Sequence, residues 1–164
     1  MPNQEVRRGF AECLFKHVAG RGSDANRGHF FQAYVRFRRS GEFPPFIEAL
    51  KTFYAALPYQ WEKDNRNEHY YHALLYTLLV SFGADVTAEE PTSKGCSDLT
   101  LRMPKGIYVM EIKYDHTAQD ALDQINQKGY AEKYRLDGRP VTKVGIAFSS
   151  EERNITEWKA EPLV

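Results

Sequence analysis

The stretch that most constrains the fold is residues 95–114, because it reads as a single β-hairpin. Its sequence, GCSDLTLRMPKGIYVMEIKY, holds two runs of strand-forming residues, 97–102 and 107–114. Between them lies the tetrapeptide MPKG (103–106), with proline and glycine at the positions that a type I turn favours. The stretch therefore predicts two antiparallel strands joined by a tight turn.

One pairing of these strands brings two acidic side chains together. If the tetrapeptide forms the loop and Arg102 faces Ile107, Asp98 lies directly opposite Glu111. Lys113 follows Glu111 at the next-but-one position, so both side chains point to the same face of the sheet. The opposite face then carries the apolar residues of a predicted core, which are Leu99, Leu101, Tyr108 and Met110.

The sequence does not force this register. A three-residue loop with a bulge at Gly106 would shift the pairing by one residue and send the two acids to opposite faces. A primed two-residue turn is disfavoured, because Pro104 cannot adopt the positive φ that such a turn needs. The four-residue loop, which opposes the two acids, and the bulged three-residue loop, which separates them, both stay open.

Opposed carboxylates repel each other unless a cation lies between them. Their Cβ atoms would be about 5 Å apart, and the repulsion is about 3 kcal/mol at an effective dielectric constant near 20. A divalent cation would turn this repulsion into attraction, and oxygen ligands suit Mg²⁺ or Mn²⁺. The simpler alternative is an exposed hairpin face with ordinary charges, since an Asp, Glu and Lys at this spacing also arise by chance.

Asp98 and the tripeptide Glu111-Ile112-Lys113 resemble the motif of the PD-(D/E)xK nuclease superfamily. The surrounding sequence is similar to one bacterial and archaeal branch, in which this domain commonly follows an AAA-ATPase-like domain. Two residues depart from the pattern: Ser97 stands in place of proline, and Cys96 stands where the branch often has arginine. The stretches that carry the likeness, in order between residues 67 and 158, are NEHYYHALLYTLLVSFGA, PTSKGCSDLTL, YVMEIK, ALDQINQKGYAEKY and GIAFSSEERNITEW.

The resemblance implies an α/β fold of the restriction-endonuclease-like type. Its αβββαβ core has a mixed central sheet of about five strands flanked by helices. We expect a helical N-terminal segment over residues 1–60 and a nuclease-like domain over residues 61–164. The pattern predicts helices over 3–19, 29–39, 45–57, 67–82 and 117–134, and strands over 85–89, 141–148 and 154–158 besides the hairpin, with the last residues frayed.

The resemblance also implies a Mg²⁺- or Mn²⁺-dependent nuclease that hydrolyses phosphodiester bonds, with DNA as the expected substrate. Asp98, Glu111 and the main-chain carbonyl of Ile112 would be the metal ligands. Lys113 would orient the attacking water or help to deprotonate it, and would offset negative charge in the transition state.

Two further site residues rest on the same likeness. Glu68 would hold a second metal ion or a bound water, although an acid at this position also stabilises a helix N-terminus. Gln124 would support the metal ligands or contact the phosphate, with Tyr130 a weaker candidate, or it would lie on an exposed polar edge. His69 and His72 lack the further Cys or His ligands that zinc would need.

Composition bears on partners and compartment. Lys+Arg and Asp+Glu balance at 22 each, whereas a free-standing nucleic-acid binder is usually basic. The two cysteines, Cys13 and Cys96, make no zinc or disulfide pattern, which fits a reducing cytoplasm. No stretch is long and apolar enough to cross a membrane. The first six residues resemble the segment that follows the ATPase-like domain in longer relatives, so we expect a truncated chain with an ATPase-like domain or partner.

Two other functions remain open. One is a binding or effector module in which the nuclease-like residues are vestigial or regulatory, and the zero net charge favours it. The other is a structural domain that binds another protein and carries the hairpin charges incidentally.

Overall fold

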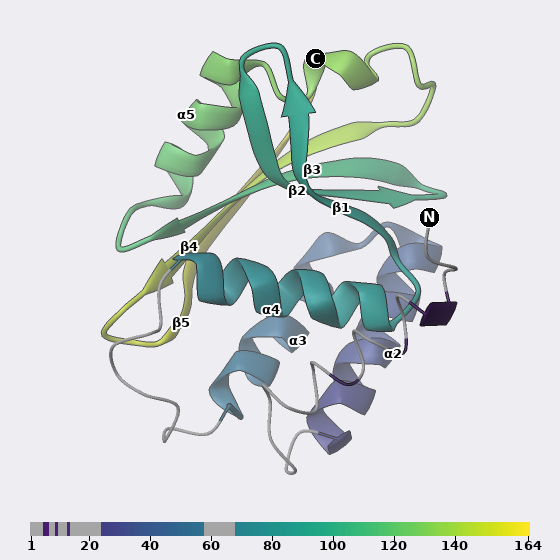
Figure 1. Ribbon diagram of the computed structural model, residues 1–164, viewed down its shortest axis with the longest axis vertical. Helices are drawn as coiled ribbons and strands as arrows, with labels where there is room; N and C mark the ends of the chain where they lie inside the picture. The colour runs from purple at the N-terminus through teal and green to yellow at the C-terminus, as the bar shows by residue number, and fades with distance from the viewer. Residues whose placement is uncertain (1–4, 7–8, 10–12, 14–23, 58–67) are drawn as a thin grey trace. The chain divides into compact units, whose positions relative to one another are not determined.

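The computed structural model describes residues 5–6, 9, 13, 24–57 and 68–164 (Figure 1). The chain divides into two compact units, residues 1–84 and 85–164. The helix predicted over residues 3–19 lies almost entirely outside the described residues. In the described part of the chain, no helix combines the length and the apolar character that a membrane crossing needs.

The described part of the N-terminal unit is helical. Its long helices are α2 (Asp24–Ser40), α3 (Phe43–Ala55) and α4 (Glu68–Ser81). Glycines in the left-handed region follow two of them, Gly41 after α2 with φ 78° and Gly83 after α4 with φ 74°. The three helices predicted here are confirmed, although α2 begins earlier than expected.

Phenylalanine side chains form the core of this unit. Phe30, Phe37, Phe46 and Phe53 are each at most 1% exposed. The ring centroids of Phe30 and Phe46 lie 5.1 Å apart, and those of Phe37 and Phe46 lie 4.9 Å apart. These tilted ring contacts join α2 to α3.

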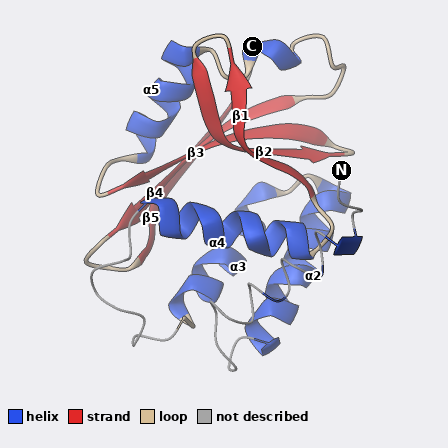
Figure 2. Ribbon diagram, viewed as in Figure 1, coloured by secondary structure: helices blue, strands red, loops and turns tan. Residues whose placement is uncertain are grey.

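The C-terminal unit is built on a five-stranded mixed sheet with the strand order β1-β2-β3-β4-β5 (Figure 2). Strands β1 (Asp85–Thr92), β2 (Gly95–Met103) and β3 (Gly106–Tyr114) form an antiparallel meander. Strand β4 (Val141–Ser149) runs parallel to β3, and β5 (Asn154–Pro162) pairs antiparallel with β4. The β3–β4 pair is the only parallel one in the sheet, so it needs a crossover connection.

Helix α5 (Ala118–Lys128) makes that crossover and packs its apolar side on the sheet. Leu122 and Ile125 of the helix share a buried cluster with Ile107 and Val109 of β3. The order α4-β1-β2-β3-α5-β4 gives the predicted αβββαβ core, to which β5 adds a further strand. The α/β fold of the restriction-endonuclease-like type is therefore confirmed.

The prediction of one helix over residues 117–134 was right at its start and wrong at its end. Thr117 caps α5 in a reciprocal capping box with Asp120. The helix stops at Lys128 because Gly129 adopts a left-handed conformation, with φ 61°. A short 3₁₀ helix, η1 (Glu132–Tyr134), follows.

The β2–β3 hairpin has the predicted register, since Arg102 pairs with Ile107. Its loop is shorter than predicted, because Met103 pairs with Gly106 and leaves a two-residue turn at 104–105. The non-glycine residues with positive φ in the described chain all lie elsewhere, so this turn avoids the primed geometry that proline forbids. The extra pair lengthens the ladder without shifting it.

The two edge strands extend well past their predicted ends. Strand β1 continues to Thr92 and β5 continues to Pro162. Each contains a proline, and both strands lie at an edge of the sheet, where a missing N–H donor is tolerated. Beyond β5, the N–H of Leu163 donates to the carbonyl of Val141 at 2.9 Å, whereas Val164 at the end of the chain is exposed.

Gly145 in β4 lets α5 approach the sheet closely. A Cβ at this position would lie 2.2 Å from the carbonyl oxygen of Ala118 and 3.1 Å from the Cβ of Ala121. A fixed main-chain atom cannot move aside as a flexible side chain can. Gly145 is also the β4 partner of Glu111 in β3. It therefore determines how closely α5 approaches the sheet next to a predicted site residue.

Replacing Gly145 with alanine should therefore separate α5 from β4. We expect Gly145→Ala to lower the free energy of unfolding by about 2–3 kcal/mol, the upper part of the range for overpacking, as measured by urea denaturation. The matched control is Gly28→Ala in α2, where an added Cβ meets nothing within 4 Å. That change should stabilise the protein by about 0.5–1 kcal/mol, since alanine favours a helix interior. Equal stability of the Gly145→Ala protein and the wild type would contradict the close approach.

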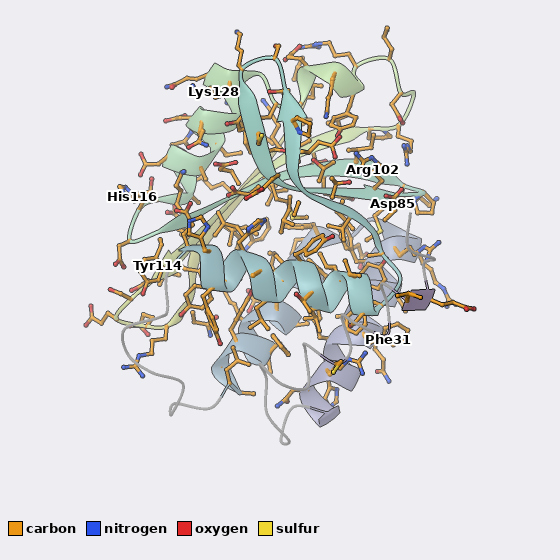
Figure 3. The ribbon with its side chains drawn as sticks, viewed as in Figure 1. Phe31, Asp85, Arg102, Tyr114, His116 and Lys128 are labelled. Carbon is orange, nitrogen blue, oxygen red and sulfur yellow. The ribbon has the colours of Figure 1, made fainter. Side chains whose placement is uncertain are left out.

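Charged side chains tie β1 to β2 and to η1. Arg102 donates to Glu90 at 2.9 Å and lies 3.6 Å from the exposed Asp85 (Figure 3). Lys133 donates to the other oxygen of Glu90 at 2.7 Å, and Arg102 donates to the hydroxyl of Tyr134 at 3.2 Å. Partial burial alone would raise the pKa of Glu90, but the hydrogen bonds from Lys133 and Arg102 outweigh it and lower the pKa to about 2.

This network should make stability depend on acid pH. A carboxyl group whose pKa falls on folding contributes stability that is complete above its ordinary pKa of 4.5 and is lost as the pH falls toward 2. We expect Glu90→Gln to lower the free energy of unfolding by about 1–2 kcal/mol at pH 7, with the difference shrinking below pH 4.5. Asp85→Asn, which alters only the exposed partner of Arg102, should cost less than about 0.5 kcal/mol. A Glu90→Gln effect that stays constant down to pH 3 would rule out this account.

Candidate active site

Asp98 and Glu111 lie where the β2–β3 ladder ends. The last regular pair on this side is Leu99 with Met110, so the two acids are the next residues of the predicted register. Side chains bridge the strands here. The N–H of Asp98 donates to Oε2 of Glu111 at 3.4 Å, and the N–H of Ile112 donates to Oδ2 of Asp98 at 2.8 Å. The prediction that the two acids face each other is confirmed.

The main chain of Ile112 faces the same gap. Its N–H points toward β2, because it reaches the Asp98 carboxylate. In an extended strand the N–H and the C=O of one residue point to the same edge, as they do in a hydrogen-bonded antiparallel pair. The carbonyl oxygen of Ile112 is therefore directed toward the side of the strand on which Asp98 lies.

Glu111 is a buried acid held by several polar groups. Its side chain is 2% exposed, and the Nζ atom of Lys113 lies 3.5 Å from its Oε1 atom. The amide of Gln124 also donates a hydrogen bond to Oε1. Burial, followed by the charge of Asp98, raises the pKa of Glu111 to about 8, although Lys113 and the Asp98 N–H act in the opposite direction. A charged Glu111 is therefore disfavoured unless a cation compensates for it.

The donor set fits a hard divalent cation. Two carboxylates and one main-chain carbonyl supply oxygen atoms only, which is the ligand type that Mg²⁺ and Mn²⁺ prefer. In the ranges that the structure describes, no group of three or more His, Cys, Asp or Glu side chains gathers at one point. The two acids with the Ile112 carbonyl are thus an incomplete protein shell, of the kind in which Mg²⁺ keeps several waters.

Gln124 reaches Glu111 because two contacts fix the position of α5: a hydrogen bond at its first residue and its close approach to Gly145 of β4. The N–H of Ala118, the first residue of α5, donates to Glu157 of β5 at 3.0 Å. The Gln124 amide also lies 3.5 Å from the hydroxyl of Tyr130, which is 3% exposed. Gln124 is half-buried and in contact with the site, so it does not lie on an exposed polar edge.

Glu68 opens α4 in the N-terminal unit and is half-buried. It lies in a different unit from Asp98 and Glu111, so its role toward the metal stays a prediction. His69, the next residue of α4, is exposed, whereas His72 is half-buried.

Of the two residues that depart from the motif, Ser97 is buried and Cys96 is exposed. Ser97, which stands in place of proline, is 1% exposed, and its hydroxyl lies 3.3 Å from that of Thr100. Cys96 is exposed and pairs with Pro91 of β1. The serine therefore serves as a buried hydrogen-bonding residue next to Asp98.

Sequence reasoning missed Gly145, although a signal was present. Glycine in the interior of a strand marks a bulge or a close approach of another backbone. The approach of α5 to Gly145 decides where Gln124 lies.

Comparisons with known proteins identify the family of the chain. A family model described as "PD-(D/E)XK nuclease superfamily" matches residues 66–158, which include the start of α4 and all the candidate residues. A relative from Azotobacter chroococcum mcd 1, described as "Uncharacterized protein in vnfD 5'region", is 30% identical over 169 residues. The match covers 99% of this chain and 32% of the relative, so the chain spans about a third of the relative's length. No solved structure matches the chain.

The buried Glu111 should lower the stability of the metal-free protein at alkaline pH. A carboxyl group whose pKa rises on folding holds its proton more tightly in the folded state, so stability falls as the pH rises from about 4.5 to about 8. Glu111→Gln keeps the shape and a hydrogen-bond acceptor for Gln124 but removes the charge. We expect this variant to exceed the wild type by about 1–3 kcal/mol at pH 9 in the presence of a chelator, and to differ little at pH 5, as measured by urea denaturation.

The matched control for this experiment is Glu151→Gln, which alters an exposed acid in the turn before β5. Its stability should follow the pH profile of the wild type. A Glu111→Gln protein that is less stable than the wild type at pH 9 would show that the polar contacts of Glu111 outweigh the penalty for burying its charge.

Proposed function

This chain belongs to the PD-(D/E)XK nuclease superfamily, and on that premise we propose that it hydrolyses phosphodiester bonds in DNA with the aid of Mg²⁺ or Mn²⁺. One observation carries the proposal: Asp98 and the buried Glu111 meet across the end of the β2–β3 ladder, with Lys113 beside them. In this reaction a water oxygen attacks phosphorus and the bond from phosphorus to the leaving oxygen breaks.

The chain's own groups would divide the work as follows. The carboxylates of Asp98 and Glu111 and the carbonyl of Ile112 would hold the ion, with Glu68 holding a second ion or a water beside it. When bound, the ion polarises the phosphate and lowers the pKa of water. Lys113, 3.5 Å from Glu111, would orient the attacking water and offset charge on the phosphate in the transition state.

Gln124 would act through Glu111. Its amide donates to Oε1 of Glu111, the same oxygen that Lys113 approaches, so it restricts the rotation of that carboxylate. A fixed carboxylate keeps its other oxygen, Oε2, on the side of Asp98. Tyr130 would in turn restrict the amide of Gln124.

The chain would act as part of a larger protein that includes an ATPase-like domain. The difference in length from the Azotobacter relative supports the larger protein, because about two thirds of that relative lies outside the matched region, and the ATPase-like domain is proposed from the resemblance alone. The balance of 22 basic and 22 acidic residues supports it as well, since another domain or partner would then supply much of the attraction for DNA. Both cysteines are free, which supports a cytoplasmic setting.

A second candidate is a catalytically silent effector module that binds nucleic acid or protein and keeps the metal site for regulation. The zero net charge is the observation that favours it.

Cleavage of labelled DNA and RNA by the purified chain, with Mg²⁺ or Mn²⁺, distinguishes these functions. We expect DNA cleavage, and we expect Asp98→Asn and Lys113→Ala to reduce its rate by at least about a hundredfold, as loss of a charge-stabilising or proton-handling group does. The matched control is Lys105→Ala, which removes an exposed lysine in the β2–β3 turn and should leave the rate unchanged.

Thermal unfolding with and without metal supplies the second readout. Metal that raises the melting temperature of the wild type but not of Asp98→Asn, without any cleavage, would favour the effector module. Absence of both cleavage and metal-dependent stabilisation would contradict the nuclease and the metal site together.

A further inference from the structure

Glu89 in β1 has an unusual backbone for a strand residue. Its φ is 49°, in the left-handed region that side chains other than those of glycine, asparagine and aspartate seldom adopt. The residue is exposed, so packing of its side chain does not explain the conformation. Residues kept in such regions are held there by their surroundings, and they cluster at functional sites.

Glu89 lies across the sheet from Asp98. The β1–β2 register passes from Ala88 paired with Leu99 to Glu90 paired with Ser97, so Glu89 and Asp98 are the two residues between these pairs. On the other side of β2, regular pairing with β3 ends at Leu99. The regular ladder is therefore interrupted at Asp98 on both of its edges.

This interruption matches the contacts that Asp98 makes. Its N–H is directed to Oε2 of Glu111, and its carboxylate accepts the N–H of Ile112. An Asp98 in regular pairing would use its main chain in the ladder, and its side chain would stand roughly perpendicular to the sheet. The contact with the N–H of Ile112 instead places the carboxylate beside the edge of β3.

The next residues of β1 hold Glu89 in its conformation. Arg102 and Lys133 both donate to Glu90, and Lys133 also donates to the carbonyl of Pro91 at 3.0 Å. On the other side, Ala88 remains paired with Leu99. The change of direction is thus confined to one residue by contacts on each side of it.

We propose that Glu89 is a positioning residue for Asp98: its left-handed backbone interrupts the β1–β2 ladder and turns the aspartate toward Glu111 and Ile112. The backbone of Glu89 performs this role, and its carboxylate does not. The consequence for metal binding rests on the proposed function, whereas the consequence for the Asp98–Ile112 contact does not.

The test compares side chains that differ in their tolerance of a positive φ. Glycine and asparagine adopt this region readily, and valine resists it because its β-branched side chain crowds the backbone. We expect Glu89→Gly, Glu89→Asn and Glu89→Gln to bind Mn²⁺ within about twofold of the wild type, and Glu89→Val to bind it about tenfold more weakly, a change typical of lost support for a metal ligand. Titration followed by electron paramagnetic resonance of free Mn²⁺ measures the affinity.

The matched control is Arg153→Val. Arg153 precedes β5 and has a similar φ of 54°, so valine imposes a similar backbone penalty at a position that is not the sheet neighbour of Asp98. This variant should lose thermal stability as Glu89→Val does, yet bind Mn²⁺ as the wild type does. If Glu89→Val weakened Mn²⁺ binding only by destabilising the fold, Arg153→Val would weaken it to a similar extent.

A second readout needs no metal. The amide proton of Ile112 donates to the Asp98 carboxylate, so its NMR chemical shift and its exchange rate with solvent report the position of that carboxylate. Glu89→Val should shift this resonance and increase its exchange, whereas Glu89→Gly should not. If Glu89→Val does not fold, Glu89→Thr, whose side chain is also β-branched, should change the Ile112 amide in the same direction.

Two results would overturn the proposal. One is an unchanged Ile112 amide in whichever of Glu89→Val and Glu89→Thr folds. The other is a loss of Mn²⁺ affinity in Glu89→Gln equal to that in Glu89→Val, which would assign the effect to the carboxylate. Failure of the wild type to bind Mn²⁺ would instead contradict the proposed function, and the Ile112 amide would still decide the role of Glu89.

Discussion

The contact between Asp98 and Glu111 is the interaction on which the rest of the site depends. Two acidic side chains meet where a sheet ladder ends, and one of them is almost fully buried. Such a pair is unfavourable by itself, so the fold surrounds it with compensating groups. Lys113 supplies a positive charge, and the main-chain N–H groups of Asp98 and Ile112 supply donors to the two carboxylates. These groups do not fully offset the burial of Glu111, because its pKa remains raised. A bound cation would supply the missing compensation.

The position of α5 follows from requirements of different kinds. Thr117 and Asp120 cap its first turn, and Gly145 allows its backbone to approach β4. Gly129 ends the helix, and the chain then turns to bring Lys133 to Glu90 of β1. The crossover helix is therefore linked at its start to β5 and, through η1, to β1 at the opposite edge of the sheet. In this way Gln124 is held against Glu111 although it belongs to neither of the two strands that carry the acids.

The residues that sequence reasoning placed correctly share one property: local chemistry determines them. The Asp98–Glu111 register follows from the alternation of side chains and from the turn residues. It was therefore predicted correctly although the loop has two residues and not the predicted four. The ends of the helices predicted over residues 29–39 and 67–82, and the start of the one predicted at 117, also follow from neighbours in sequence, because Gly41, Gly83 and Thr117 lie there. The ends of β1, α5 and β5 were placed less well, because pairing at a sheet edge and a left-handed glycine override the average preferences of the residues there.

The amino-acid sequence by itself determined the hairpin and allowed the pairing that brings Asp98 to Glu111, since side-chain alternation and turn chemistry act over a few neighbouring residues, and its resemblance to a known family implied the α/β class. Only the tertiary structure decided that Glu111 is buried, that Gln124 contacts it, and that Glu89 leaves the strand conformation beside Asp98. Each of these depends on groups brought together from distant parts of the chain. Burial, close approach and backbone strain are properties of such assembled neighbourhoods, and no short stretch of sequence contains them.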